Sequence, residues 1–371
     1  MKERSKELLS VGFWQRSHPG PSRIPKRWED VTPAWMTAAI ASRHPDALVA
    51  DVALLEKDDG TNRRARFGLT YAQGTGPARV FLKAHAASHR WVHFRNGNLF
   101  GEARLFRSGA TLSVEHPAVY SAIVDLPRLD FLLVMEDLTL RGADPLDATR
   151  PMTPAQAADG LRGLAKLHSH YWNFSARAHP ELRFVQTWKD RKGWTVGLNK
   201  RVPTGLDRGR GSLPNEILQY SGIEIVGFWS RYVASLAVGT TTLLHGDAHI
   251  GNTYLLPNNG VGFLDWQVVR RGEWSQDAGY FLVSALTEKD RRAHEKSLIE
   301  EYRQALDVPD AQRPSAAEAW LRYRASAAYG LAIWLSTLGT DGYQRREVSL
   351  ALAKRFTAAF LELGTLSALS G

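Results

Sequence analysis

The sequence predicts an α+β fold in which a small lobe built on an antiparallel β-sheet precedes a larger, mainly helical lobe. Residues 48–138 contain five apolar runs of strand length that are separated by turn-forming residues, whereas later segments show apolar residues at helical spacing. The 371 residues are enough for two compact lobes, each with its own core. We expect residues 1–137 to form the first lobe and residues 138–371 the second.

The composition is that of a globular protein, with 44% hydrophobic and 10% aromatic residues. No apolar run approaches the roughly 18 residues of a membrane span, so we expect no membrane partner. The first twenty residues lack the apolar segment of a secretory signal, and cysteine is absent, which is compatible with a cytoplasmic protein. The net charge of +9 suits an anionic ligand, but no nucleic-acid-binding motif accompanies it, so we expect no nucleic acid partner.

The elements of the first lobe follow from turn and periodicity signals. Residues 1–31 have no regular period and predict an arm or short helix packed on this lobe. Thr32 and Pro33 predict a helix start, because threonine caps helices and proline fits their first turn. Residues 117–126 and 129–138 predict the last two strands. The first three strands, expected to form a meander, are residues 48–56, 63–71 and 78–84.

A lysine and a glutamate of the first lobe are expected to form a pair. Lys83 lies within the third strand between apolar residues, where an ammonium group costs free energy unless it reaches water or a carboxylate. Glu102 follows about twenty residues later on a segment with helical spacing and is the carboxylate that we expect to meet it. The alternatives are a strand lysine whose end reaches solvent and a glutamate on an exposed helix face.

The second lobe is predicted to be helical, with one exception. Thr153 and Pro154 predict the start of a long helix, on which His168 is expected to be a hydrogen-bonded core histidine that braces the polar loop at residues 245–252. Residues 186–212 are rich in glycine and basic residues and lack a consistent period, which predicts an irregular insert. A helix is expected just before residue 243, and residues 286–368 are expected to be helical throughout.

The stretch 243–267 carries the strongest chemical signal of the chain. Its apolar runs 253–256 and 261–264 are joined by Pro-Asn-Asn-Gly, which predicts a β-hairpin. A hairpin would return Asp265 close to Asn252, five residues after Asp247. Two carboxylates and an amide suit a base and a Mg²⁺ site, because Mg²⁺ takes few protein oxygens and shares its other positions with phosphates and water.

The alternative interpretation of this stretch is a surface hairpin with scattered polar turn residues. An isolated His-Gly-Asp tripeptide would favour that alternative. The joint spacing, H-G-D-x-x-x-x-N followed by an Asn-Gly hairpin and then Asp-Trp, favours a phosphotransferase site.

These residues resemble the catalytic and metal-binding segments of the aminoglycoside phosphotransferase and choline kinase-like superfamily, which is related to the protein kinases. Gln267 after Asp265-Trp266 resembles the ecdysteroid-kinase-like (CHK-like) branch most. The resemblance spans about residues 48–340 and implies a bilobal, protein-kinase-like fold. It also implies an ATP- and Mg²⁺-dependent kinase for a small-molecule hydroxyl, with Asp247 as the catalytic residue and Asn252 and Asp265 as metal ligands.

The resemblance further implies where the nucleotide binds. Lys83, held by Glu102, would contact the α- and β-phosphates. The turn with Gly60 and Asn62 would cover the phosphates, although it lacks G-x-G-x-x-G and could equally be an ordinary hairpin turn. Main-chain groups near Glu136 and Leu138 would bind adenine. Asp277 would be a structural residue that hydrogen-bonds the catalytic loop.

The acceptor is the least defined part of the prediction. Kinases for polycationic aminoglycosides or choline are expected to offer an acidic or cation-binding site, whereas residues 138–371 contain more basic than acidic residues. We therefore expect a hydroxylated acceptor that is apolar or flat, and not a polycationic aminoglycoside. His249, Trp188 and Trp194 are the residues expected to contact it.

Two other functions compete with a kinase. A catalytically inactive, nucleotide-binding pseudokinase-like module would have the same fold, but Lys83, Asp247, Asn252 and Asp265 are all chemically competent. A hydrolase that uses His245 and Asp247 is disfavoured, because no nucleophile pattern such as G-x-S-x-G is present.

Overall fold

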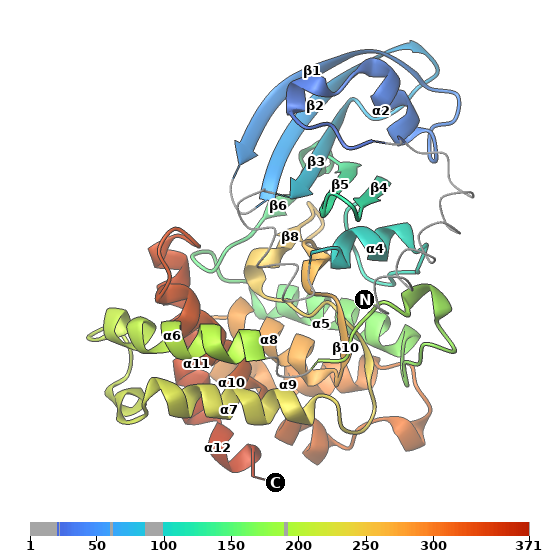
Figure 1. The fold of residues 1–371 in the computed structure, drawn as a ribbon. Helices are drawn as coiled ribbons and strands as arrows, with labels where there is room; N and C mark the ends of the chain where they lie inside the picture. The colour runs from blue at the N-terminus through green and yellow to red at the C-terminus, as the bar shows by residue number, and fades with distance from the viewer. Residues whose placement is uncertain (1–20, 22, 60–61, 86–98, 189–191, 371) are drawn as a thin grey trace. The chain divides into compact units, whose positions relative to one another are not determined.

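The computed structural model describes residues 21, 23–59, 62–85, 99–188 and 192–370 (Figure 1). The chain divides into two compact units. The first, here called the β unit, consists of Met1–Ala110 and Pro117–Gly142, and the second, the helical unit, of Thr111–His116 and Ala143–Gly371. The expected phosphate-covering residue Gly60 and most of the expected N-terminal arm lie outside the described residues.

The β unit contains the predicted five-stranded antiparallel sheet, in the order β1-β2-β3-β5-β4. Each predicted strand is confirmed, with small shifts at the ends. Strands that follow each other in the sequence are neighbours in the sheet, except that β5 lies between β3 and β4. The strands are β1 (Leu48–Asp59), β2 (Asn62–Gln73), β3 (Arg79–His85), β4 (Val119–Asp125) and β5 (Asp130–Glu136).

Both faces of this sheet are covered. Successive side chains of β5 point to opposite faces, so Leu132 and Val134 join one core cluster while Leu133 and Met135 join another. Residues of α2 pack in the first cluster, and Ala103 of α4 packs in the second. The Thr32 hydroxyl accepts the Trp35 N–H, which confirms the predicted helix start. The two helices are α2 (Pro33–Ile40) and α4 (Gly101–Arg107).

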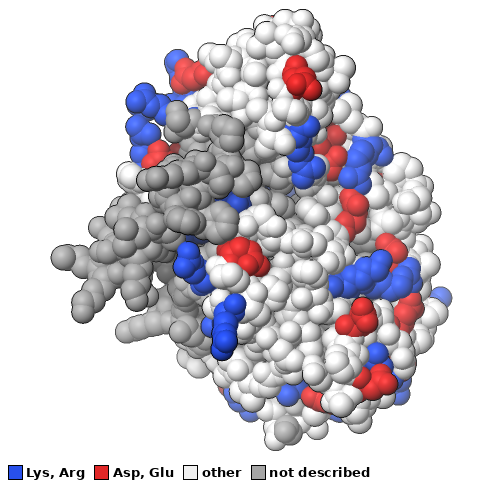
Figure 2. Space-filling model, turned by 90° about the vertical axis from the view of Figure 1, so that its right-hand side faces the viewer, with Lys and Arg blue, Asp and Glu red and all other residues white. Residues whose placement is uncertain are grey.

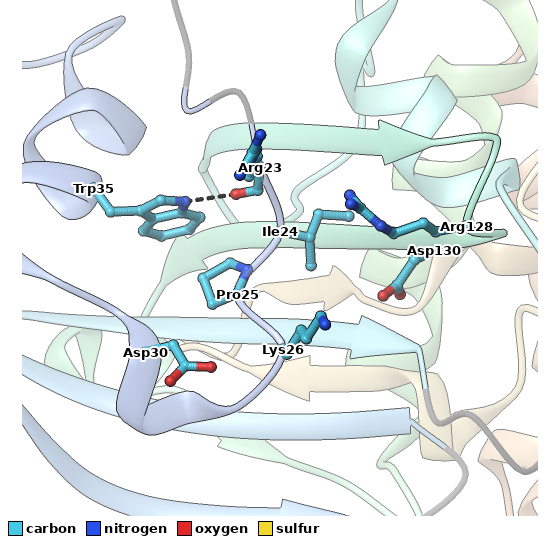
Figure 3. Close-up of a pocket in the computed structure, with 8 residues that line it drawn as sticks. All are labelled: Arg23, Ile24, Pro25, Lys26, Asp30, Trp35, Arg128 and Asp130. Atoms are coloured by element: carbon cyan, nitrogen blue, oxygen red, sulfur yellow. Dashed lines mark hydrogen bonds between the residues drawn. The ribbon is translucent and has the colours of Figure 1, made fainter.

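A pocket of about 470 Å³ opens in the β unit beside residues 23–26 (Figure 3). The indole N–H of Trp35 donates to the Arg23 carbonyl oxygen at 2.8 Å, and this hydrogen bond joins two residues that line the pocket. Arg128 and Asp130, from the β4–β5 turn and the start of β5, line the opposite part. None of the described residues that are predicted to bind nucleotide lines this pocket.

The helical unit is arranged around α10 (Ala316–Leu338), which packs against six other helices of the unit. Its residues from Ala325 to Leu338 are buried with few exceptions. Among the described residues, no helix combines the length and apolar character that crossing a membrane requires. The other helices are α5 (Pro154–His170), α6 (Lys192–Gly209), α7 (Gly222–Ser235), α8 (Ser275–Ala285), α9 (Glu288–Ala305), α11 (Arg346–Glu362) and α12 (Thr365–Ala368).

The prediction of an irregular insert at residues 186–212 is wrong, because most of this segment forms α6. Leu198 and Val202, four residues apart, are buried on one face of the helix. The glycines that suggested a loop serve helix packing instead: a Cβ on Gly205 would lie only 1.8 Å from the Leu335 carbonyl oxygen of α10. Tertiary contact therefore outweighs the low helix propensity of glycine and of Pro203.

Short strands complete the helical unit, and some of them, such as β8, are part of the stretch 243–267 (Figure 1). They form a two-stranded sheet, β10-β7, and a three-stranded sheet, β6-β8-β9. The predicted hairpin is confirmed as the antiparallel pair β8–β9. The strands are β6 (Asp144–Pro145), β7 (Thr242–Leu244), β8 (Thr253–Leu255), β9 (Val261–Phe263) and β10 (Arg270–Gly272).

Charged side chains are mixed on the surface that Figure 2 shows. Lys and Arg side chains lie beside Asp and Glu side chains there, without an extended area of a single sign. The net charge of +9 is therefore not concentrated on this face.

The packing of α6 on α10 predicts a matched pair of glycine variants. Gly205→Ala should destabilise the protein by about 1–3 kcal/mol, because the added methyl group collides with main chain that cannot rotate away. Gly227→Ala, at an exposed position of α7 with open space around it, should instead stabilise by about 0.5–1 kcal/mol through helix propensity. Urea denaturation of both variants checks this, and equal effects would contradict the assigned contact.

Candidate active site

Asp277 of α8 fixes the position of the His-Gly-Asp segment. Its buried carboxylate accepts the backbone N–H groups of His245 at 2.6 Å and of Gly246 at 2.9 Å. His168 lies 3.3 Å from the same carboxylate through Nε2, and its Nδ1 lies 2.7 Å from the Tyr302 hydroxyl. These contacts agree with the bracing role predicted for His168 and the structural role predicted for Asp277.

Gly246 is required by the close approach of two main-chain segments. Its φ is +83°, and a Cβ at this position would lie 2.1 Å from the Val268 carbonyl oxygen. Any other residue would meet both the left-handed backbone strain and this collision. The glycine between His245 and Asp247 therefore lets the loop turn tightly enough to place Asp247 beside the hairpin.

The hairpin returns Asp265 to Asn252, as its sequence predicts. Thr253 pairs with Phe263 across β8 and β9, and the Leu264 N–H donates to the Asn252 carbonyl oxygen at 2.9 Å. Asp265 follows directly, with a left-handed φ of 65° that few residues other than glycine adopt. This backbone conformation begins the turn that separates Asp265 from the strand, and such strain occurs frequently at functional sites.

Asn252 is bound to the predicted catalytic residue. Its Nδ2 donates to the Asp247 carbonyl oxygen at 2.9 Å and to Asp247 Oδ2 at 3.1 Å, so its amide oxygen is turned away from that carboxylate. Burial raises the pKa of Asp247 to about 7, and the charge of nearby Asp265 adds to the increase, while the Asn252 hydrogen bond opposes it. The Asp247 side chain nevertheless keeps 25% exposure, so it remains accessible.

His249 is a neutral histidine beside Asp247. Its Nδ1 accepts the Gly251 N–H at 3.0 Å, and its Nε2 lies 4.0 Å from Asp247 Oδ2, beyond hydrogen-bond distance. Burial lowers the pKa of His249 to about 3, with a further contribution from His245. With Nδ1 accepting, the single ring proton is on Nε2, which is therefore a donor.

The predicted pair in the β unit is present. Lys83 Nζ on β3 lies 2.6 Å from Glu102 Oε2 on α4, and both side chains are at most 5% exposed. Antiparallel pairing of β3 with β5 and packing of α4 on the same sheet bring the two residues together. The apolar surroundings of a strand lysine were a sufficient signal, because a buried ammonium group requires a carboxylate partner.

The other predicted nucleotide residues lie at the ends of strands. Asn62 begins β2 and is buried, Glu136 ends β5, and Leu138 begins the 3₁₀ turn Leu138–Arg141. Between the latter two, buried Asp137 lies 3.0 Å from Arg66 Nε, an ion pair that sequence reasoning missed. The signal available was the polar Glu-Asp dipeptide directly after a buried strand.

The two tryptophans predicted to contact the acceptor lie in an aromatic cluster of the helical unit. Trp188 is 2% exposed, and its ring centroid lies 5.6 Å from Tyr329 and 6.0 Å from Trp194. Trp194 also stacks on Trp229 at 6.4 Å. Trp194 therefore lies on α6 and not in an irregular insert, and contact of either tryptophan with the acceptor stays a prediction.

Two aromatic residues next to His249 were not predicted. The Tyr280 ring of α8 lies 5.8 Å from the His249 ring, and the Trp334 ring of α10 lies 5.0 Å from it, both edge to face. A weak signal existed for Tyr280, which is three residues after Asp277 and so lies on the same side of its helix. The position of Trp334 depends on the packing of α10 and had no sequence signal.

The sheet with its Lys83–Glu102 pair and the helical unit with its H-G-D loop and β8–β9 hairpin define a protein-kinase-like phosphotransferase fold. The sequence agrees with this fold, because residues 70–325, which are more than half of the chain, match the model of the phosphotransferase enzyme family. The chain belongs to this family. No curated protein matches the sequence.

Solved structures of phosphotransferases are similar to this chain. One, assigned as an aminoglycoside phosphotransferase from Ralstonia eutropha JMP134, has a TM-score of 0.54 and 16% identity and covers 90% of this chain and 97% of its own. At this identity the similarity concerns the fold alone. A spectinomycin phosphotransferase in complex with ADP and spectinomycin has a TM-score of 0.49 and 12% identity, and the match covers 90% of this chain and 99% of that one. A choline kinase from Cryptosporidium parvum Iowa II has a TM-score of 0.47 and 10% identity, and the match covers 98% of this chain and 97% of that one.

The contacts of Asp277 predict a stability effect that differs from that of a surface aspartate. Asp277→Asn should destabilise the protein by about 1–3 kcal/mol, because an amide cannot accept with both atoms from the His245 and Gly246 N–H groups. Asp310→Asn, at a side chain that is 92% exposed, should change stability by less than about 0.5 kcal/mol. Chemical denaturation of the two variants measures the difference, and equal stabilities would contradict the role of Asp277.

Proposed function

We propose that this protein transfers the γ-phosphoryl group of ATP to a hydroxyl group of a small molecule in a Mg²⁺-dependent reaction. The observation that carries the proposal is the meeting of Asp247, Asn252 and Asp265 through the register of one hairpin. Family membership supports phosphoryl transfer as the reaction class. The acceptor oxygen would bond to the γ-phosphorus as its proton leaves, while the bond to the β-phosphate oxygen breaks and ADP departs.

The residues of the hairpin fit a magnesium ion. Asn252 Oδ1 and the Asp265 carboxylate would hold it, and both are hard oxygen ligands of the kind that Mg²⁺ takes. Within the described part of the chain, no cluster of three His, Asp or Glu side chains forms a complete protein cage. A site with few protein ligands suits Mg²⁺, which keeps water and phosphate oxygens in its shell. When bound, the ion neutralises phosphate charge during transfer.

Asp247 would orient the acceptor hydroxyl and receive its proton. The Asn252 amide fixes one carboxylate oxygen, Oδ2, and the exposed part of the side chain is available to an acceptor. A pKa of about 7 lies in the range that suits a general base at neutral pH. The loop that carries Asp247 is held through two backbone hydrogen bonds to Asp277, so the base is positioned before substrate binds.

The β unit would bind the nucleotide. Lys83, held in place by Glu102, would contact the α- and β-phosphates, and Asn62 lies at the turn expected to cover them. Main-chain groups around Glu136 and Leu138 would bind adenine. The Glu136 N–H is already bonded to the Ala118 carbonyl oxygen, so its carbonyl oxygen and the Leu138 main chain are the groups proposed for this contact.

The pseudokinase-like alternative has less support. A binding module needs the nucleotide contacts of Lys83 but has no requirement for an accessible base. Here Asp247 is held by Asn252 and braced by Asp277, an arrangement that serves catalysis. The hydrolase alternative also weakens, because the His245 ring lies 3.0 Å from the Leu264 carbonyl oxygen and supports the hairpin.

The role of Asp247 predicts a separation of catalysis from binding. Asp247→Asn should lower kcat by about 10²–10⁴-fold, since the base is lost, while Mg·ATP affinity stays within about threefold of the wild type. ATP turnover and calorimetric nucleotide binding test this together. Asp341→Asn, at a side chain that is 90% exposed, is the matched control and should leave both quantities unchanged. Retention of more than a tenth of wild-type kcat by Asp247→Asn would refute the assignment.

The role of Asp265 predicts a metal-dependent defect. Asp265→Ala should weaken the binding of Mg·ATP by more than tenfold, because a metal ligand is removed, and should leave metal-free ATP binding nearly unchanged. Calorimetry with Mg²⁺ and with a chelator separates the two. Asp310→Ala provides the surface control. Equal Mg·ATP affinities in wild type and variant would show that the metal is held elsewhere.

A further inference from the structure

A second contact between α8 and the loop 245–252 lies in the last turn of the helix, far from Asp277 in the first turn. The Ser284 hydroxyl accepts the Ile250 N–H at 2.9 Å. Ile250 begins a short 3₁₀ turn that ends at Asn252, the proposed metal ligand. Ser284 and Asp277 are seven residues apart, which is about two helical turns, so both lie on the face of α8 that meets the loop.

The Ile250 N–H is satisfied outside the loop, whereas the next N–H groups of the turn find acceptors within it. Gly251 donates to His249 Nδ1 at 3.0 Å, and Asn252 donates to the His249 carbonyl oxygen at 2.8 Å. The leading N–H groups of a helical turn have no partner in the turn itself and need one from elsewhere. Ile250 is fully buried, so loss of its acceptor would leave an N–H group away from water.

Ser284 is itself held in a fixed orientation. It is fully buried, and its hydroxyl donates to the Phe281 carbonyl oxygen at 2.8 Å, which directs the oxygen lone pairs toward the loop. The Ser284 carbonyl oxygen accepts from Arg355 Nη1 of α11, and Arg355 Nη2 donates to the Ala148 carbonyl oxygen at 2.7 Å. A guanidinium group at this end of α8 satisfies a carbonyl group that the helix leaves unpaired and complements the helix dipole.

The loop is therefore attached to α8 on both sides of Asp247. Asp277 accepts main-chain N–H groups on the N-terminal side of Asp247, and Ser284 accepts one on its C-terminal side. Because a helix is rigid, the spacing of these two acceptors sets the spacing of the two attached segments. The Asn252 amide donates to Asp247 Oδ2 at 3.1 Å across the loop, so this contact depends on both attachments.

We propose that Ser284 is a positioning residue of the active site, and that its hydroxyl fixes the Asn252 amide relative to Asp247 by holding the Ile250 N–H. This inference rests on the proposed phosphotransferase function. Ser284 acts through the 3₁₀ turn and does not contact ATP or the metal. Without the hydroxyl, the turn that carries Asn252 loses its attachment to α8, while the attachment by Asp277 remains. The expected consequence is a lower affinity of the site for Mg²⁺.

Ser326 of α10 offers a matched control. Both serines are almost fully buried, and each hydroxyl donates to the carbonyl oxygen three residues earlier in its own helix, at 2.8 Å for Ser284 and 2.7 Å for Ser326. Ser284 accepts the loop N–H in addition. Alanine at either position removes the same atom from the same kind of helical site, but only at Ser284 does the loop lose a contact.

Calorimetric titration of ATP with excess Mg²⁺ and with EDTA tests the proposal on the wild type and both alanine variants. Ser284→Ala should weaken the binding of Mg·ATP by about 3–10-fold, because the orientation of a metal ligand is lost. The affinity for metal-free ATP should stay within about twofold of the wild type, since the nucleotide contacts are unchanged. Ser326→Ala should leave both affinities unchanged.

A purely structural role of Ser284 would give a different result. It would lower the midpoint of thermal unfolding and leave the ratio of the two affinities as in the wild type. An unchanged ratio in folded Ser284→Ala, or an equal change in Ser326→Ala, would therefore overturn the proposal. Ser284→Cys keeps a weak acceptor of similar size and should change the ratio less than alanine does. If the alanine variant does not fold, an unchanged ratio in the cysteine variant contradicts the proposal.

The wild-type titration separates this inference from the proposed function. If the wild type binds Mg·ATP more tightly than metal-free ATP and Ser284→Ala keeps the same preference, the proposed function stands and the role of Ser284 is wrong. If the wild type does not bind Mg·ATP, the proposed function itself fails, and this inference fails with it.

Discussion

The carboxylate of Asp277 accepts the backbone N–H groups of both His245 and Gly246, and the geometry of the candidate active site depends on this interaction. It attaches the loop to the first turn of α8, inside a core that also includes His168. The loop leaves this attachment through a glycine whose φ of +83° no other residue adopts easily. Asp247 is therefore held by main-chain contacts, and its side chain remains available for chemistry.

The β8–β9 hairpin brings a second group of ligands to the same place. Its register pairs Thr253 with Phe263, so Asn252 and Asp265 stand at the open end of the hairpin, on the side where Asp247 lies. A shift of one residue would turn the side chains of the strand to opposite faces and separate the ligands. Burial raises the pKa of Asp247, and the charge of nearby Asp265 adds to the increase. A divalent cation held by Asn252 and Asp265 would weaken the second of these effects.

Sequence patterns predicted those parts of the structure that local rules determine. The Asn-Gly hairpin returned Asp265 to Asn252 as expected, and a lysine inside an apolar strand implied the carboxylate of Glu102. The segment containing α6 was mispredicted, because its glycines were interpreted as loop residues, whereas Gly205 allows close contact with α10. The position of Trp334 beside His249 was not predictable, because it depends on how α10 crosses α8 and the catalytic loop.

The central claim is that one hairpin supplies the metal ligands while the preceding loop supplies the base. Anomalous diffraction from crystals grown with Mn²⁺ and a non-hydrolysable ATP analogue tests it most directly. The account predicts a Mn²⁺ ion coordinated by Asn252 Oδ1, the Asp265 carboxylate and phosphate oxygens, with the Asp247 carboxylate facing the γ-phosphate. A metal bound to other residues, or a nucleotide whose γ-phosphate lies away from Asp247, would contradict it.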